Sequence, residues 1–185
     1  DAFMLGFFFG ITVRKENPRK KNPLIVIGMD GRLSSPILEE KLNEGLENSG
    51  CEIYRIGLGP TPMLYFASHY YKADGAIQVT GSHNPKDYNG FKIVLNQNSF
   101  FGDNIQKLGH LANKGYSKTY NGFSKSVEIR SEYIDEITKP LKNIDRGLHK
   151  KTIVWDCGNG ASGPSVEMLT KRIPGKHVVL YSKVD

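Results

Sequence analysis

The chain has 185 residues, of which 38% are hydrophobic and 24% are charged, and its mean hydropathy is -0.41. These values are typical of a globular protein with a water-facing surface, and they argue against a membrane protein or a disordered chain. The net charge of +6 indicates attraction to anions, but the basic residues are scattered, so we expect no nucleic-acid partner. The two cysteines, Cys51 and Cys157, have no metal-like spacing, which favours a reducing compartment and a cytoplasmic location.

The first apolar run, residues 2–13, predicts a helix buried in a core. It is too short to span a bilayer, which takes about 20 residues. It also lacks the preceding basic stretch and the small-residue cleavage site of a secretion signal. The basic run that follows, residues 14–21, contains Pro and Asn and predicts a solvated loop, so we expect no membrane contact.

Strands and helices alternate along the rest of the chain, which predicts an α/β fold with helices packed on a parallel or mixed sheet. The first helix of this series is predicted over residues 36–49, with Ser35 as its cap and Gly50 just past its end. Strands are predicted at 24–28, 52–56, 76–79, 91–95 and 151–156, further helices at 61–72, 103–112 and 131–144, and a polar loop at 113–122. The helix over 131–144 is predicted despite Pro140.

A polar stretch at residues 145–150 precedes a fresh strand, so we place a domain boundary there, with residues 1–148 as one domain and 149–185 as the beginning of a second. The second part carries a glycine-rich turn, residues 158–164. This turn lacks the lysine and the spacing of a P-loop, so we interpret it as a structural strand-to-helix turn.

A single serine, Ser82, lies on a short polar loop between the strands predicted at 76–79 and 91–95. The neighbouring Gly81 allows close backbone approach to a ligand, and consecutive amide groups of such a loop can form a nest for an anion. A serine in this position can carry a phosphoryl group. A polar hairpin loop without chemistry is the alternative interpretation.

The loop sequence is Thr80-Gly81-Ser82-His83-Asn84-Pro85, and it continues through Asp87-Tyr88-Asn89-Gly90-Phe91-Lys92. It resembles the phosphoserine loop of the α-D-phosphohexomutases, in particular the bacterial phosphomannomutase/phosphoglucomutase branch. Residues 28–35, 57–63 and 154–160 resemble further stretches of that family in the same order, so the resemblance covers nearly the whole chain. It implies a layered α/β/α domain with a mixed sheet, without its first strand, and the truncated start of a second similar domain. The chain would then be an amino-terminal fragment.

The resemblance also implies an activity, the interconversion of hexose 1-phosphate and hexose 6-phosphate through a phosphoserine at Ser82 and a bisphosphate intermediate. The implied cofactors are Mg²⁺, bound to the phosphoryl oxygen of Ser82, and a hexose 1,6-bisphosphate activator. We do not find the family's loop of three magnesium-binding carboxylates in this chain. We therefore expect the fragment alone to be inactive and to need the missing carboxy-terminal domains or a chain that carries them.

Four further residues are candidates for the site. Lys92 matches the family's active-site lysine, and its ammonium group could stabilise phosphoryl charge or assist proton transfer. His83 and Asn84 follow the serine and are expected to contact phosphate or substrate, or to order the loop. Arg32 could bind phosphate or brace the loop through carboxylate or carbonyl contacts. Met29 stands where the family pattern has arginine, which weakens a phosphate role for that stretch.

The residues leave two questions open. They do not predict which hexose phosphate is preferred, because the loop that distinguishes the sugars in the family has no match here. They also leave a second interpretation, in which the chain is a non-catalytic remnant or a binding module that associates with a partner chain.

Overall fold

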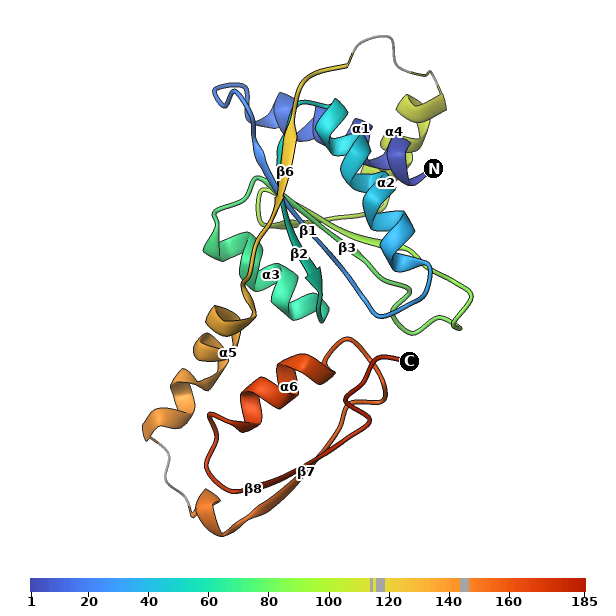
Figure 1. Ribbon diagram of the computed structural model, residues 1–185. Coiled ribbons are helices and arrows are strands. Elements are labelled where there is room, and N and C mark those ends of the chain that lie inside the picture. The colour runs from blue at the N-terminus through green and yellow to red at the C-terminus, as the bar shows by residue number, and fades with distance from the viewer. Residues whose placement is uncertain (114, 116–118, 144–146) are drawn as a thin grey trace.

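The computed structural model describes residues 1–113, 115, 119–143 and 147–185 (Figure 1). Its strands are β1 (Leu24–Met29), β2 (Glu52–Leu58), β3 (Gly75–Val79), β4 (Phe91–Leu95), β5 (Asn98–Phe100), β6 (Phe123–Ser126), β7 (Thr152–Asp156) and β8 (Lys176–Leu180). Its α-helices are α1 (Ala2–Glu16), α2 (Ser35–Asn48), α3 (Thr61–Tyr70), α4 (Asp103–Asn113), α5 (Arg130–Thr138) and α6 (Gly163–Thr170). Two 3-10 helices, η1 (Lys139–Asn143) and η2 (Leu148–Lys150), follow α5.

The larger sheet has six strands in the order β5-β4-β3-β1-β2-β6. Strands β3, β1, β2 and β6 run parallel, whereas β4 pairs antiparallel with β3 and with β5. The predicted α/β fold with a mixed sheet is therefore confirmed. Every residue of β3 is buried, as expected for a central strand that is covered on both faces.

Helices cover both faces of this sheet and complete an α/β/α sandwich (Figure 1). The core on one face is formed by α1, α2 and α4, and it includes the fully buried Phe9, Leu42 and Leu46. The core on the other face is formed by α3 and the segment that leads into α5. The apolar run 2–13 is thus a core helix, as predicted. Within the described ranges, no helix has both the length and the apolar character needed to cross a bilayer.

Several details differ from the sequence-based expectation. Helix α5 ends at Thr138 and gives way to η1, because Pro140 cannot donate the backbone hydrogen bond that would continue the α-helix. Ser35 is not the cap of α2 but its first residue, and Ser34 occupies the cap position without a side-chain hydrogen bond. The Ser35 hydroxyl instead donates to the carboxylate of Asp30 at 2.5 Å.

Strands β5 and β6 were not predicted. Both are short and largely exposed, so they lack an apolar run that would indicate a strand. Part of the predicted loop 113–122, the last residue of the predicted helix 131–144 and the first two residues of the boundary stretch 145–150 lie outside the described residues.

The last part of the chain forms a parallel pair, β7 and β8, with α6 between them in sequence. Arg130 connects this unit to the larger sheet, because its guanidinium donates to the carbonyl of Leu58 and to the hydroxyl of Ser165, both at 2.6 Å. The division into domains at residue 148 stays a prediction.

Helices α1 and α2 pack closely, and this contact can be tested. A Cβ atom at Gly45 would lie 2.1 Å from the carbonyl oxygen of Phe3, so Gly45→Ala forces the helices apart. We expect it to lower the free energy of unfolding by about 1–2 kcal/mol in urea titrations, despite the better helix propensity of alanine. The matched control is Gly109→Ala in α4, where a Cβ atom meets no described atom within 4 Å. An unfolding free energy for Gly45→Ala equal to or above that of the control variant would contradict the packing.

Candidate active site

The strand order places two loops side by side at one edge of the large sheet. From β1 the chain crosses to β2 on one side, and from β2 it returns to β3 on the other side of β1. The loops that follow β1 and β3 therefore diverge from neighbouring parallel strands, and such a reversal of strand order is the usual ligand-binding crevice of an open α/β sheet. The loop after β3, residues 80–90, is the one that carries Ser82.

Ser82 is exposed, and its backbone lies in the left-handed region with φ at 50°. A non-glycine residue in this region costs about 1–2 kcal/mol and persists where its surroundings hold it. The amide of Ser82 donates to the hydroxyl of Thr80 at 3.0 Å. Ser82 is thus exposed to solvent, while its backbone is held by a hydrogen bond within the loop.

Arg32 supplies most of that support. Its guanidinium donates to four carbonyl oxygens of the loop, those of Ser82 at 3.1 Å, Asn84 at 2.8 Å, Pro85 at 2.5 Å and Tyr88 at 2.9 Å. These contacts are those of a brace, one of the two roles predicted for this arginine. They occupy the four terminal N–H groups of the guanidinium, and Nε faces a carboxylate of Asp30 at 3.3 Å. No donor of Arg32 is left for a phosphate in this arrangement.

Asp30 was missed by the sequence reasoning, although it lies within one of the stretches that resemble the family. Its Oδ1 accepts hydrogen bonds from the Arg32 amide at 3.1 Å and from the Ser35 hydroxyl, and its Oδ2 accepts one from the Gly81 amide at 3.2 Å. Burial raises the pKa of the Asp30 carboxyl, but the hydrogen bonds from Ser35, Arg32, Thr80 and Gly81 outweigh it and hold the pKa below the ordinary value.

Three of the amides that could have formed an anion nest already have partners within the protein. The Gly81 amide donates to Asp30, the Ser82 amide to Thr80, and the Asn84 amide to the carbonyl of Gly81. The loop uses these donors to fix its own shape, because buried or partly buried amides need partners of their own.

The remaining candidates lie in the loop or just after it. His83 and Asn84 are exposed beside Ser82, and the carbonyl of Asn84 is tied to Arg32. Lys92 is exposed on β4, where it pairs in register with Gln78 of β3. The structure thus joins Arg32 to Ser82 and Asn84 of the loop through hydrogen bonds, and it places His83 and Lys92 near Ser82 in sequence.

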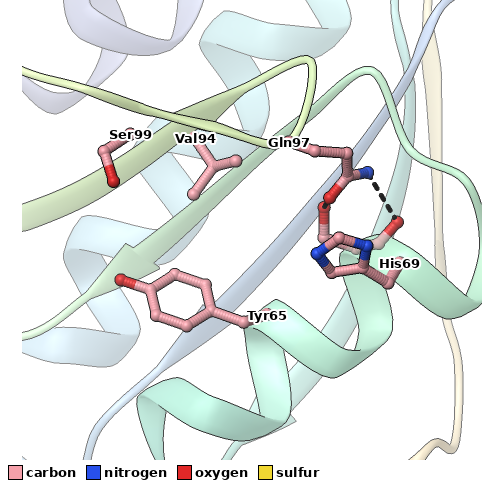
Figure 2. Close-up of a pocket in the computed structure, with 6 residues that line it drawn as sticks. Tyr65, His69, Val94, Gln97 and Ser99 are labelled. Atoms are coloured by element: carbon pink, nitrogen blue, oxygen red, sulfur yellow. Dashed lines mark hydrogen bonds between the residues drawn. The ribbon is translucent and has the colours of Figure 1, made fainter.

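A separate hollow of about 210 Å³ lies away from this loop (Figure 2). Its walls come from α3, from β4, from the turn that follows β4 and from β5, and they consist of Tyr65, Ser68, His69, Val94, Gln97 and Ser99. None of these residues belongs to the Ser82 loop, so the hollow is not part of the candidate site.

The described residues contain no group of three or more His, Cys, Asp or Glu side chains that could hold a metal ion. The carboxylate of Asp30, which contacts the loop, already accepts hydrogen bonds from Arg32, Ser35 and Gly81.

Comparison with known proteins identifies the family. Residues 2–118 match the family model described as "Phosphoglucomutase/phosphomannomutase, alpha/beta/alpha domain I", and this chain belongs to that family. The structure of a phosphoglucomutase/phosphomannomutase family protein from Burkholderia thailandensis is similar over 100% of this chain and 40% of that chain, with 34% identity and a TM-score of 0.85.

Two curated relatives show the extent of the match. The phosphomannomutase/phosphoglucomutase of Pseudomonas syringae is 34% identical over 179 residues, and the phosphoglucomutase of Neisseria gonorrhoeae is 34% identical over 181 residues. Each alignment covers 97% of this chain and 38% of the relative, so the chain spans less than half the length of the curated relatives it matches.

The Arg32 brace predicts a change in loop dynamics. A lysine at position 32 cannot make the four carbonyl contacts, so Arg32→Lys should speed amide exchange in peptides covering residues 80–90. We expect at least about a tenfold increase, because one lost charged hydrogen bond is worth about 1.5 kcal/mol. Hydrogen exchange with mass spectrometry measures this, with Arg19→Lys in the exposed loop before β1 as the matched control. Equal exchange in the two variants would show that Arg32 does not hold the loop.

The lowered pKa of Asp30 predicts a pH effect. A carboxyl whose pKa is lower in the folded state than in the unfolded state stabilises the fold above its unfolded pKa, and this stability is lost as the pH falls through the folded pKa. The loss in unfolding free energy between pH 6 and pH 3 should therefore be smaller for Asp30→Asn than for the wild type. Urea titrations at both pH values measure it, and equal losses would contradict the pKa assignment.

Proposed function

We propose that this chain carries the phosphoserine part of a phosphohexomutase active site, and that the whole protein interconverts hexose 1-phosphate and hexose 6-phosphate. One observation carries the proposal: the exposed Ser82 lies on a loop whose backbone is fixed by Arg32 and Asp30 at four carbonyls and one amide. A plain hairpin turn between two strands does not need such support. The names of the curated relatives agree with this activity.

The chemistry is a pair of phosphoryl transfers at Ser82. In the first, the bond between phosphorus and Ser82 Oγ breaks while a hydroxyl of the hexose monophosphate bonds to phosphorus and releases its proton to a base, and Ser82 Oγ takes up a proton. In the second, Ser82 Oγ releases its proton and bonds to the other phosphorus of the hexose 1,6-bisphosphate, while the bond from that phosphorus to the sugar oxygen breaks and the sugar oxygen takes up a proton. Such transfers depend on positioning and on stabilisation of charge, and a rigid loop supplies the positioning.

Three exposed side chains are proposed to meet the substrate. The Lys92 ammonium would stabilise phosphoryl charge, and His83 and Asn84, which follow the reactive serine, would contact phosphate or sugar. Arg32 is not assigned to phosphate, because its guanidinium is engaged with the loop.

Mg²⁺ is the proposed cofactor, and a hexose 1,6-bisphosphate is the proposed activator. A bound Mg²⁺ would neutralise charge on the transferred group, and the phosphoryl oxygen of Ser82 is the one contact that we propose for this chain. The further proposed partners are the hexose phosphates and the carboxy-terminal domains, and we propose that the chain alone does not turn over. The buried free thiols of Cys51 and Cys157 fit the cytoplasmic location that we propose.

The test is a chimera in which this chain replaces the matching 38% of the Pseudomonas aeruginosa phosphomannomutase/phosphoglucomutase. We expect the chimera to convert glucose 1-phosphate to glucose 6-phosphate when primed with glucose 1,6-bisphosphate. Ser82→Ala should lower kcat by more than about a thousandfold, because it removes the nucleophile. Ser99→Ala, at an exposed serine of β5, is the matched control.

Peptide mapping of the same samples checks for phosphate on Ser82. A chimera that is folded by circular dichroism, but has neither turnover nor a phosphate on Ser82, would overturn the proposal. That result would favour a non-catalytic binding module instead. Turnover that survives Ser82→Ala would also overturn the assignment of Ser82.

A further inference from the structure

Asp30 takes part in none of the steps above, yet it lies at the centre of the loop contacts. It follows β1, and its amide donates to the carbonyl of Val79 at 2.9 Å, which continues the pairing of β1 with β3. The pairing of β1 with β3 therefore places Asp30 next to the start of the Ser82 loop.

The two oxygens of Asp30 have different partners. Oδ1 serves the local turn into α2, through the Arg32 amide and the Ser35 hydroxyl. Oδ2 serves the distant loop, because it accepts from the Gly81 amide at 3.2 Å and faces Nε of Arg32 at 3.3 Å. The second oxygen thus joins the loop after β1 to the loop after β3.

This arrangement secures the backbone on both sides of the reactive serine. Before Ser82, the Gly81 amide is held by Asp30; after it, the Ser82 carbonyl is held by Arg32 at 3.1 Å. Ser82 adopts a left-handed conformation that its own preference disfavours, so contacts on each side are what keep it there. The two residues that make these contacts, Asp30 and Arg32, form an ion pair with each other.

The ion pair also has an electrostatic consequence. A carboxylate alone beside a phosphoserine would repel the phosphoryl group, whereas Asp30 and Arg32 together add no net charge. Their side chains are only 18% and 16% exposed, so the pair lies beneath the loop. Asp30 and Arg32 can therefore support the loop without themselves binding the phosphoryl group.

We propose that Asp30 is a positioning residue for phosphoryl transfer at Ser82. It acts through the Gly81 amide and through the orientation of Arg32, and it does not touch the substrate. The inference rests on the function proposed above. Because a displacement of about 1 Å at a reacting atom can lower a rate about a hundredfold, loss of this support should lower kcat and leave substrate binding nearly unchanged.

The decisive variant is Asp30→Asn, which is nearly isosteric. The asparagine carbonyl can still accept from Ser35 and from the Arg32 amide, but its NH₂ group cannot accept from Gly81 and faces Nε of Arg32 donor to donor. The variant therefore removes the contacts of Oδ2 and keeps those of Oδ1. Asp103→Asn, at an exposed aspartate at the start of α4, is the control for loss of one charge.

Two measurements are made on these variants. In the chimera described above, we expect Asp30→Asn to lower kcat by about 10- to 100-fold with KM for glucose 1-phosphate within about twofold of the unsubstituted value. In the 185-residue chain, we expect the Gly81 amide to exchange at least about tenfold faster by NMR, while the Asp103→Asn control changes neither quantity.

Each outcome decides between the two proposals. An active chimera whose kcat is unaffected by Asp30→Asn would overturn the positioning role and leave the proposed function standing. A rise in KM with unchanged kcat would also overturn it, because it would indicate a contact with substrate. A folded but inactive unsubstituted chimera would be a failure of the proposed function, and the positioning role for that reaction would fall with it.

Discussion

The whole site depends on the reversal of strand order at β1. Because β1 lies between β2 and β3, the loops that leave β1 and β3 are neighbours in space although they are far apart in sequence. One loop supplies Asp30 and Arg32, and the other supplies Ser82. A sheet in which β2 and β3 followed on the same side of β1 would have put another strand between these loops, and the brace could not form.

In the Ser82 loop, the backbone groups and the side chains have different roles. Its carbonyls and several amides turn inward to Arg32, Asp30 and Thr80, whereas the side chains of Ser82 and His83 remain exposed. Conformational entropy is then lost on folding, and not when the substrate binds. For the phosphoryl transfer proposed above, an exposed serine on a fixed backbone satisfies the geometric requirement without being enclosed in advance.

Much of this fold could be predicted, because most of its helices and strands have a recognisable local sequence pattern. The central strands are apolar runs, and α2 repeats leucine every four residues, so periodicity found them. Strand β6 was missed because Phe123–Ser126 has no such run; it forms through its parallel pairing with β2. The predicted helix over 131–144 is shorter in the structure, because Pro140 has no backbone N–H to continue the α-helical hydrogen bonds.

The site was only half predictable for a related reason. The Ser82 loop is one continuous motif, so it was recognised, whereas Asp30 acts on Gly81 through a contact that spans 51 positions. An anion nest was one possibility that local composition offered, but the Gly81 amide donates to the carboxylate of Asp30, which is distant in sequence. Local sequence identifies a reactive loop more readily than it identifies what holds that loop.

The position of Arg32 explains why the motif has glycine at position 81. Glycine was expected there to let the backbone approach a ligand, but a Cβ atom at Gly81 would lie 2.4 Å from Cζ of Arg32 and 2.7 Å from the carbonyl oxygen of Tyr88. The space that a side chain would need is filled by the guanidinium of the brace. Gly81 and Arg32 therefore form one steric unit: the glycine allows the arginine to reach four carbonyls, and the arginine in turn holds the serine beside it.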